Sequence, residues 1–270
     1  MATQIMGVLN VTPDSFSDGG RYNTVDTALH HAENLLKAGA DYIDIGGQST
    51  RPGATNLSPE DERQRVIPVI AAITQRFPEA NLSIDTFEPT VLEAALAYPI
   101  SMLNDITALA NERNRHLVQY SGIQVCLMHM QNTPRTMQEN PTYESVVDEV
   151  FHFLEERITA CITDGIKPSQ LRIDPGFGFG KSLSHNLQLL QQLDAFTALS
   201  CPIVVGMSRK SMLGELTGKP VDQRLYAGLA AAVIAITKGA SMIRTHDVDA
   251  TIDAIAIADA CLAPPILEDL

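Results

Sequence analysis

Eight short runs of apolar, β-forming residues alternate with longer segments of helical character, and this alternation restricts the possible folds more than any other feature. The runs are apolar on both faces, as expected for strands of a parallel sheet covered by helices. They occupy residues 5–9, 42–45, 82–84, 101–104, 124–128, 171–174, 202–206 and 241–244. Helical segments are expected over residues 24–38, from 58 onward, and over 89–97, 112–120, 142–164, 185–196, 221–237 and 249–262.

Eight strands with a helix after each predict a closed parallel sheet, the (β/α)8 TIM barrel. The alternative is an open doubly wound sheet, but the fingerprint glycines of that fold are missing after the first run. No linker, repeat or low-complexity segment divides the 270 residues. The chain is therefore expected to form a single α/β domain over residues 1–270, an ordinary length for such a barrel.

The composition points to a small-molecule ligand. The formal net charge is −13, which repels nucleic acid and anionic lipid, so an anionic ligand would need a local cationic pocket. The longest strongly apolar run, residues 229–236, is too short to cross a bilayer. The first residues lack the features of a secretory signal, and the four cysteines show no C-x-x-C spacing. A cytoplasmic protein that binds neither membrane nor nucleic acid is expected.

The stretch DPGFGFGKS at residues 174–182 looks like a phosphate loop. A P-loop needs four residues between its first glycine and its Gly-Lys pair, because the backbone wraps around a phosphate. Gly176 and Gly180 enclose only three residues, so the stretch does not predict a nucleotide site. Lys181 is interpreted as a solvated loop charge, and His129, within an apolar run, as a core histidine.

Nearly every predicted strand delivers a polar residue at its carboxyl end, where TIM barrels place their active sites. A single such residue usually caps the next helix, but so many on one rim predict a site. They are Asn10, Asp44, Asp85, Asn104, the pair Met128-His129, Asp174, the run Ser208-Arg209-Lys210, Arg244 and His246. The carboxylates, the amide and the lysine suit a flat heterocycle with an amino-pyrimidinone edge. A planar arginine can lie against such a ring, and an anionic tail would find Arg244, His246 and the last helix N-terminus.

Motifs along the whole chain resemble the dihydropteroate synthase family. They are NVTPDSFSDGG (10–20), DIGGQSTRPGA (44–54), SIDT (83–86), NDI (104–106), LMHMQNTPRTMQ (127–138), DPGFGFGK (174–181), SRKS (208–211) and RTHD (244–247). The resemblance implies a transferase of folate biosynthesis. Its reaction displaces diphosphate from 6-hydroxymethyl-7,8-dihydropterin diphosphate with the amine of p-aminobenzoate, giving dihydropteroate.

The same resemblance implies the site residues, carried over by motif position. The pterin would contact Asp85, Asn104, Ile106, Met128, Asp174, Lys210 and Arg244. The diphosphate would contact Asn10, Thr50, Arg244 and His246, and Asn10 would also bind Mg²⁺. Two mobile loops, residues 11–21 and 46–56, would close over p-aminobenzoate, with contacts from Phe16, Asp18, Thr50, Arg51, Pro52, Phe179 and Ser211. The residues expected to act in catalysis are Asp85, Asp174, Lys210, Arg244 and His246.

The resemblance carries further expectations. Pterin ring nitrogens can share positive charge that develops at the methylene carbon, so a loose, SN1-like displacement is expected, with Asp85 and Asp174 near that charge. The FGFG stretch, residues 177–180, is interpreted as a flexible loop that admits p-aminobenzoate. Sulfonamides, which mimic p-aminobenzoate, are expected to inhibit, and the chain is expected to form a homodimer through its last helices. Gln48 departs from the glutamate usual in the family and removes a charge beside the second loop.

Two other functions are compatible with part of this sequence. One is a pterin-binding methyltransferase that moves a methyl group from methyltetrahydrofolate to a corrinoid protein; it needs no diphosphate site, so the SRKS and RTHD motifs disfavour it. The other is a paralogue that binds pterin without turnover. The presence of Asn10, Lys210, Arg244 and His246 argues against this second reading, and Gln48 is the single feature in its favour.

Overall fold

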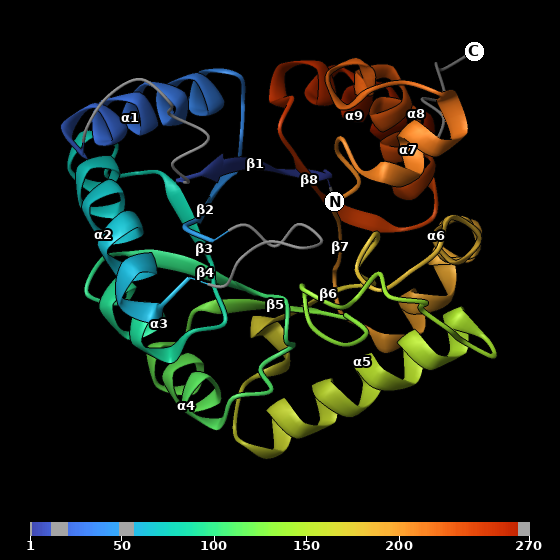
Figure 1. Ribbon diagram of the computed structural model, residues 1–270, viewed down its shortest axis with the longest axis horizontal. Helices are drawn as coiled ribbons and strands as arrows, with labels where there is room; N and C mark the ends of the chain where they lie inside the picture. Colours follow the sequence, from blue (N-terminus) through green and yellow to red (C-terminus); the bar gives the residue numbers. More distant parts are fainter. Residues whose placement is uncertain (1, 12–20, 49–56, 264–270) are drawn as a thin grey trace, which may run out of the picture.

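The computed structural model describes residues 2–11, 21–48 and 57–263, and its strands close into one parallel barrel in chain order (Figure 1). The strands are β1 (Gln4–Asn10), β2 (Tyr42–Gly46), β3 (Asn81–Asp85), β4 (Ile100–Asp105), β5 (Gln124–Met128), β6 (Leu171–Asp174), β7 (Ile203–Val205) and β8 (Ala240–Thr245). The predicted (β/α)8 barrel is confirmed, and β8 pairs with β1 to close it.

Helices form the outer ring around these strands (Figure 1). They are α1 (Arg21–Lys37), α2 (Pro59–Arg76), α3 (Pro89–Ala95), α4 (Glu112–Ser121), α5 (Val146–Thr163), α6 (Leu183–Gln191), α7 (Ser211–Thr217), α8 (Leu225–Thr237) and α9 (Val248–Leu262). Ser58 caps α2 as its sequence predicts, since its side chain accepts a hydrogen bond from the Asp61 amide at 3.1 Å. In the described part of the chain, no helix is long and apolar enough to cross a membrane.

The structure corrects three helix predictions and adds one helix. The segment predicted over 221–237 is a 3₁₀ segment, Val221–Gln223, followed by α8 from Leu225. The segment predicted over 142–164 becomes helical only at Val146, and the one over 185–196 divides into α6 and a 3₁₀ segment, Leu193–Leu199. The helix α7 was not predicted at all. Its seven residues include Gly214 and end before Gly218, so the run is too short to show a helical period.

Two apolar layers support the barrel. The larger lies between the strands and the helices, and the smaller fills the barrel interior with the side chains of Met6, Tyr42, Met102, Cys126, Val204 and Met242. Because strand side chains alternate between faces, the residue two positions after each interior residue also points into the barrel. Two residues beyond Tyr42, Met102 and Met242 come Asp44, Asn104 and Arg244. The interior layer thus directs these polar groups toward the carboxyl-terminal mouth.

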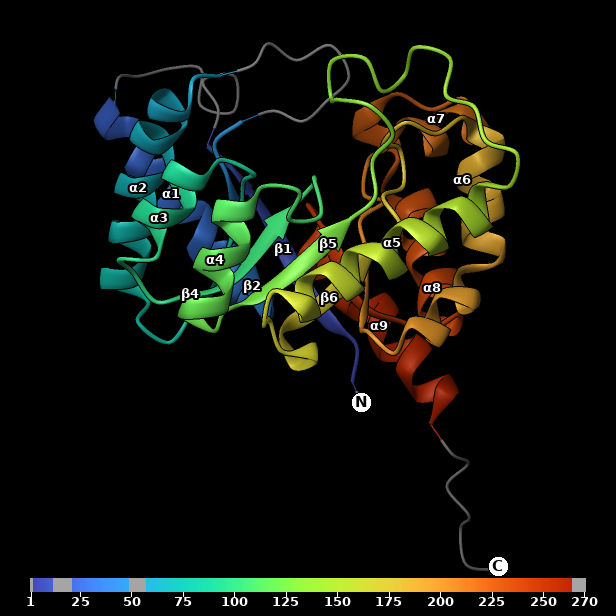
Figure 2. The same cartoon turned by 90° about the horizontal axis from the view of Figure 1, so that it is seen from below.

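The loop between β5 and α5 rises above this mouth, as the side view shows (Figure 2). Within it, Gln138 donates to the Gly178 carbonyl at 2.7 Å, and Tyr143 donates to the Gly180 carbonyl at 2.7 Å. The loop after β5 is therefore joined to the loop after β6, and together they border one side of the mouth.

Candidate functional site

The mouth of the barrel brings together polar side chains from β2, β3, β4 and β8. Arg244 Nε donates to Asp44 Oδ2 at 2.7 Å, and its Nη2 donates to Asp85 Oδ2 at 2.8 Å. Asn104 Nδ2 donates to the same Asp44 oxygen at 3.1 Å. These four residues form what we name the Arg244 cluster: Arg244, Asp44, Asp85 and Asn104. The register places Asp85 beside Gly46 and Asn104, so neighbouring strands set the spacing.

The Arg244 cluster contains two carboxyl groups around one guanidinium. Asp44 is fully buried, and its Oδ1 has no hydrogen-bond partner among the described residues. A buried acceptor without a partner costs free energy, so Oδ1 has room for one more hydrogen-bond donor, such as a buried water. Burial raises the pKa of Asp85 to about 7, and Asp44 and Glu62 add to this rise while Arg244 opposes it. The two carboxylates raise the pKa of Arg244, against the effect of burial.

A second pair, Asp174 and Lys210, lies beside the Arg244 cluster. Asp174 ends β6, is 6% exposed, and accepts a hydrogen bond from the Gly176 amide at 2.7 Å. Burial raises the pKa of Asp174, and the neighbouring Lys210 opposes that rise. Burial also lowers the pKa of Lys210 to about 8, a change that Asp174 opposes. Burial thus shifts the pKa of this acid upward and the pKa of this base downward.

Lys210 reaches toward the loop after β6. Its Nζ donates to the Phe177 carbonyl and lies 4.5 Å from the centroid of the Phe179 ring, a cation–π contact. Phe177 is fully buried while Phe179 is partly exposed. The Phe179 ring thus presents an aromatic surface next to a cation at the mouth.

The glycines of DPGFGFGK are explained by their conformation and not by phosphate binding. Gly176, Gly178 and Gly180 have φ of +73°, +77° and +64°, a region open mainly to glycine. A Cβ on Gly176 would lie 1.9 Å from the His129 carbonyl oxygen, and one on Gly180 would lie 2.7 Å from the Gln131 Cβ. The loop therefore passes directly against the segment after β5.

The interpretation of Lys181 as a solvated charge is wrong. Lys181 is 3% exposed, and its Nζ bonds the Gly176 carbonyl at 2.9 Å, the Phe179 carbonyl at 3.0 Å and His129 Nδ1 at 2.8 Å. The side chain folds back under its own loop, so the adjacent glycines do not expose it. The interpretation of His129 as a core histidine is confirmed, because it is buried and packs edge-on against Phe153.

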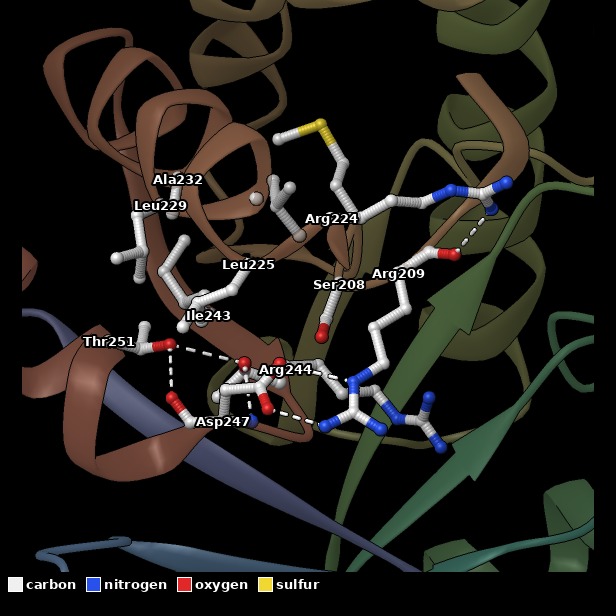
Figure 3. A pocket seen from close by; sticks show the side chains of 14 residues that line it. Ser208, Arg209, Arg224, Leu225, Leu229, Ala232, Ile243, Arg244, Asp247 and Thr251 are labelled. Carbon is white, nitrogen blue, oxygen red and sulfur yellow. Dashed lines mark hydrogen bonds and ion pairs between the residues drawn. The ribbon is translucent and has the colours of Figure 1, made fainter. Parts of the chain in front are cut away.

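The loops after β7 and β8 are joined by polar contacts (Figure 3). Arg209 pairs with Asp247, and Ser208 Oγ lies 3.1 Å from His246 Nδ1. The cavity whose lining residues this view draws is bordered by α8 and by the ends of β7 and β8 with the segments that follow them. Its space of about 20 Å³ admits about one water, so it is a packing space and no substrate site.

The remaining predicted site residues lie around the same mouth or outside the described residues. Ile106 and Met128 are buried at the ends of β4 and β5, Asn10 ends β1 beside Gly46, and Ser211 is exposed at the start of α7. Outside the described residues lie Phe16, Asp18, Thr50, Arg51 and Pro52. Among the described residues, no group of three or more His, Cys, Asp or Glu could hold a metal ion.

Sequence reasoning missed two members of the site. The sequence predicts Asp44 at a strand end but assigns it no role in the site. Because side chains alternate along a strand, the interior position of Tyr42 also places Asp44 in the barrel interior. Glu62 follows the acids Glu60 and Asp61 at the start of α2, yet it is 1% exposed and its Oε1 has no partner among the described residues. Burial raises the pKa of Glu62 to about 7. Helical spacing was a usable signal, because Glu62 lies four residues before the buried Val66 and seven before the buried Val69.

Comparisons with known proteins agree with this site. The family described as pterin binding enzyme matches residues 6–246. The dihydropteroate synthase of Escherichia coli strain K12 is 48% identical over 259 residues, covering 96% of this chain and 92% of that protein.

Solved structures of dihydropteroate synthases are also similar to this chain. The Yersinia pestis dihydropteroate synthase in complex with a sulfonamide drug is 45% identical, with a TM-score of 0.92, covering 97% of this chain and 95% of that one. The Xanthomonas albilineans dihydropteroate synthase with 4-aminobenzoic acid is 45% identical, with a TM-score of 0.91, covering 98% and 94%.

Proposed function

The chain belongs to the pterin-binding enzyme family and is a transferase with dihydropteroate synthase activity in folate synthesis, and from this premise we propose how its residues carry out the reaction. The activity joins 6-hydroxymethyl-7,8-dihydropterin diphosphate to p-aminobenzoate and releases diphosphate. The observation that carries the proposal is the cluster of buried, opposed charges at the barrel mouth, Arg244 with Asp44 and Asp85, beside Asp174 and Lys210.

The pterin binds across this set of groups. Its amino-pyrimidinone edge carries N–H donors beside a carbonyl oxygen, which need carboxylate acceptors and a cationic or amide donor. Asp85 and Asp174 supply the acceptors, and Lys210 and Asn104 supply the donors. Arg244 already has two carboxylate partners, which hold its guanidinium in one orientation and leave its planar face free to lie against the pterin ring. Ile106 and Met128 supply apolar contacts at the same rim.

The carboxylates also serve the displacement step. As the bond to diphosphate breaks, positive charge develops on the methylene carbon and spreads into the pterin ring. Fixed carboxylates near that ring stabilise the charge without rearranging, since their positions are set before the reaction. The neutral aromatic amine then attacks and needs no strong base. Asp85 and Asp174 have these roles in the proposal, which favours a loose, SN1-like displacement.

The leaving diphosphate is held by Arg244, His246, Asn10 and Thr50 in this proposal. Asn10 also offers an amide oxygen at the end of β1, a donor type that Mg²⁺ accepts when substrate phosphates and water complete its shell. The metal would neutralise charge on the departing diphosphate. The chain's own contribution is to hold the diphosphate oxygens, with His246 fixed in place by its contact with Ser208.

The p-aminobenzoate lies outward from the pterin, against the Phe179 ring and Ser211 in the proposal. Phe16, Asp18, Thr50, Arg51 and Pro52 are proposed to complete this pocket. The Yersinia pestis relative is described with a sulfonamide drug and the Xanthomonas albilineans relative with 4-aminobenzoic acid. On this support we propose that sulfonamides inhibit the present enzyme by occupying the same pocket. A cytoplasmic location is proposed with it.

A homodimer through α8 and α9 is the proposed assembly. These helices pack side by side, and their outer faces carry large exposed apolar residues: Tyr226, Ile234, Ile252, Ile257 and Leu262. Tyr226 is 76% exposed and Ile257 is 67% exposed. Exposed apolar residues gathered over neighbouring elements are typical of a protein interface. A second copy of the chain is the partner that this face fits in the proposal.

Replacing Lys210 tests the proposed roles. Lys210→Ala removes the donor to the pterin, so turnover should fall by about a hundredfold or more. The thermal midpoint should stay within a few degrees, because the side chain ends at the mouth and not in the apolar core. The exposed Lys219 gives a matched control, Lys219→Ala, with normal turnover. Normal turnover in Lys210→Ala would contradict the proposal, and a collapsed thermal transition would make Lys210 structural instead.

A further inference from the structure

The loop between β6 and α6 is held in one conformation by hydrogen bonds to its backbone. Every carbonyl from Gly176 to Gly180 accepts a hydrogen bond from a side chain. Lys181 donates to the Gly176 carbonyl at 2.9 Å and to the Phe179 carbonyl at 3.0 Å. Lys210 donates to the Phe177 carbonyl. Gln138 donates to the Gly178 carbonyl and Tyr143 to the Gly180 carbonyl, each at 2.7 Å. Loop carbonyls ordinarily bond to water. Side-chain donors to every carbonyl from Gly176 to Gly180 therefore restrict the loop backbone to one conformation. These bonds argue against the interpretation of this stretch as a flexible loop.

Lys181 supplies two of these bonds from beneath the loop. An ammonium group has three N–H donors, and Lys181 Nζ has three acceptors: the carbonyls of Gly176 and Phe179, and His129 Nδ1. Burial lowers the pKa of His129 to about 2, so its ring is neutral and one nitrogen is free to accept. With Lys181 protonated, the contact makes Nδ1 the acceptor, and the ring proton then lies on Nε2.

Keeping a charged ammonium group in this buried position costs free energy. Burial lowers the pKa of Lys181 well below its ordinary value, although the Asp174 carboxylate acts in the opposite direction. Burying a charged group is unfavourable unless its hydrogen bonds are satisfied, and an apolar residue would fill the same volume at lower cost. The benefit of Lys181 must therefore lie in the loop that it holds.

The loop above Lys181 faces Lys210. The Phe177 carbonyl bonds Lys210 Nζ, and the Phe179 ring centroid lies 4.5 Å from the same atom. We propose that Lys181 is a positioning residue for the transfer reaction: it fixes the Phe177–Phe179 backbone against Lys210 and so sets the Phe179 ring where p-aminobenzoate binds. Lys181 itself contacts backbone carbonyls and His129. The inference rests on the proposed function, because that function assigns Phe179 to p-aminobenzoate.

The test is a comparison of the two Michaelis constants in Lys181→Met. This change keeps the length of the side chain and removes the ammonium group. The KM for p-aminobenzoate should rise about tenfold, the factor that corresponds to one ordinary hydrogen bond. The KM for dihydropterin diphosphate should rise less than the KM for p-aminobenzoate, because Lys181 bonds no member of the Arg244 cluster and acts on Asp174 only through its charge. Lys37→Met, at a side chain 71% exposed, is the surface control and should change neither constant.

A pair of His129 variants tests the same inference without changing the lysine. His129→Asn keeps an acceptor near the Nδ1 position, whereas His129→Leu removes it. The leucine variant should reproduce the rise in KM for p-aminobenzoate, and the asparagine variant should retain most of the wild-type value. If Lys181→Met does not fold, this pair decides the matter. Equal values in both His129 variants would overturn the inference.

The failure of the inference is distinguishable from failure of the proposed function. A wild-type enzyme that forms no dihydropteroate would overturn the function itself. Normal wild-type turnover, with both Michaelis constants unchanged or raised in parallel in Lys181→Met, would overturn only the positioning role. A lower thermal midpoint with unchanged constants would make Lys181 a purely structural residue.

Discussion

Arg244 and Asp44 lie 200 residues apart in the sequence, yet Arg244 Nε donates to Asp44 Oδ2 at 2.7 Å inside the barrel mouth. A second nitrogen of the same guanidinium binds Asp85 at 2.8 Å. The proposed pterin site is thus charged and held by ion pairs before a substrate enters, which is the condition for electrostatic stabilisation without rearrangement.

The ion pair predicts the effect of Asp44→Asn. The amide keeps the size of the side chain but removes the charge, so Arg244 keeps only Asp85 as a carboxylate partner. Stability should fall by about 1–3 kcal/mol, the usual cost of losing a charged hydrogen bond, and turnover should fall with it. Urea unfolding and steady-state assays measure both. Asp194→Asn is the control, because its side chain is 65% exposed; equal losses in the two variants would contradict the assigned role.

The pKa values of Asp85 and Lys210 predict a bell-shaped pH dependence of kcat/KM for the pterin substrate. Asp85 must be ionised, so activity should rise as pH increases through about 7. Lys210 must be protonated, so activity should fall as pH increases through about 8. Because these groups interact, the two apparent pKa values of the profile belong to the whole set and not to single residues. Lys210→Arg should move the falling limb to higher pH, and a flat profile from about pH 6 to about pH 9 would refute the assignment.

Glu62 predicts a pH-dependent change in stability. Burial raises its pKa from 4.5 to about 7, so the folded protein keeps the proton to a higher pH than the unfolded chain. Stability is therefore lost as pH rises from 4.5 to about 7, by up to about 3 kcal/mol. Glu62→Gln cannot titrate, so its stability relative to wild type should increase with pH. Urea unfolding at about pH 5 and about pH 8 measures this, with the exposed Glu215→Gln as control. An equal difference at both pH values would exclude the titration.

Two glycines with similar positive φ, Gly176 and Gly218, predict different losses of folding stability when each is replaced by alanine. Gly218 has φ +69° with nothing within 4 Å of an added Cβ, so Gly218→Ala should lose about 1 kcal/mol from backbone strain alone. An added Cβ on Gly176 would meet the His129 carbonyl oxygen at 1.9 Å. Gly176→Ala should therefore lose several times more, about 3 kcal/mol or beyond, together with activity. Similar unfolding free energies in the two variants would show that the close approach is unimportant.

The apolar face of α8 and α9 predicts the oligomeric state. Wild type should sediment as a dimer, and Ile257→Asp should sediment as a monomer at the same concentration, because a charge in an apolar interface is unpaired. Tyr120→Asp is the matched control, since Tyr120 is 85% exposed on α4, and it should remain a dimer. A monomeric wild type, or dissociation in both variants, would refute the proposed face.

The strands and the polar rim could be predicted because they depend on local pattern. Each strand is an apolar run, and each rim residue follows it directly. Observed strand ends therefore differ from the predicted ones by only a residue or two, as for β7 at Ile203–Val205. The alternation of side chains then carries Asn104 and Arg244 into the interior without any knowledge of distant contacts.

The environment of Lys181 and Glu62 could not be predicted, because it depends on contacts between distant segments. Lys181 is buried by its bond to His129, 52 residues earlier. Helical spacing places Glu62 on the buried face of α2 with Val66 and Val69, but its packing against the Gly47 backbone depends on a distant segment. The spacing of Gly176, Gly178 and Gly180 was a usable signal, since glycine at alternate positions suggests repeated positive φ.

The most direct test of the account is diphosphate release by the purified protein given dihydropterin diphosphate and Mg²⁺, with and without p-aminobenzoate. The account predicts release that depends on p-aminobenzoate, with dihydropteroate formed in equal amount. The Lys210→Ala variant, run in parallel, should release almost none while it unfolds at nearly the wild-type temperature. Tight binding of the pterin substrate without p-aminobenzoate-dependent release in wild type would contradict the account and leave a pterin-binding protein without turnover.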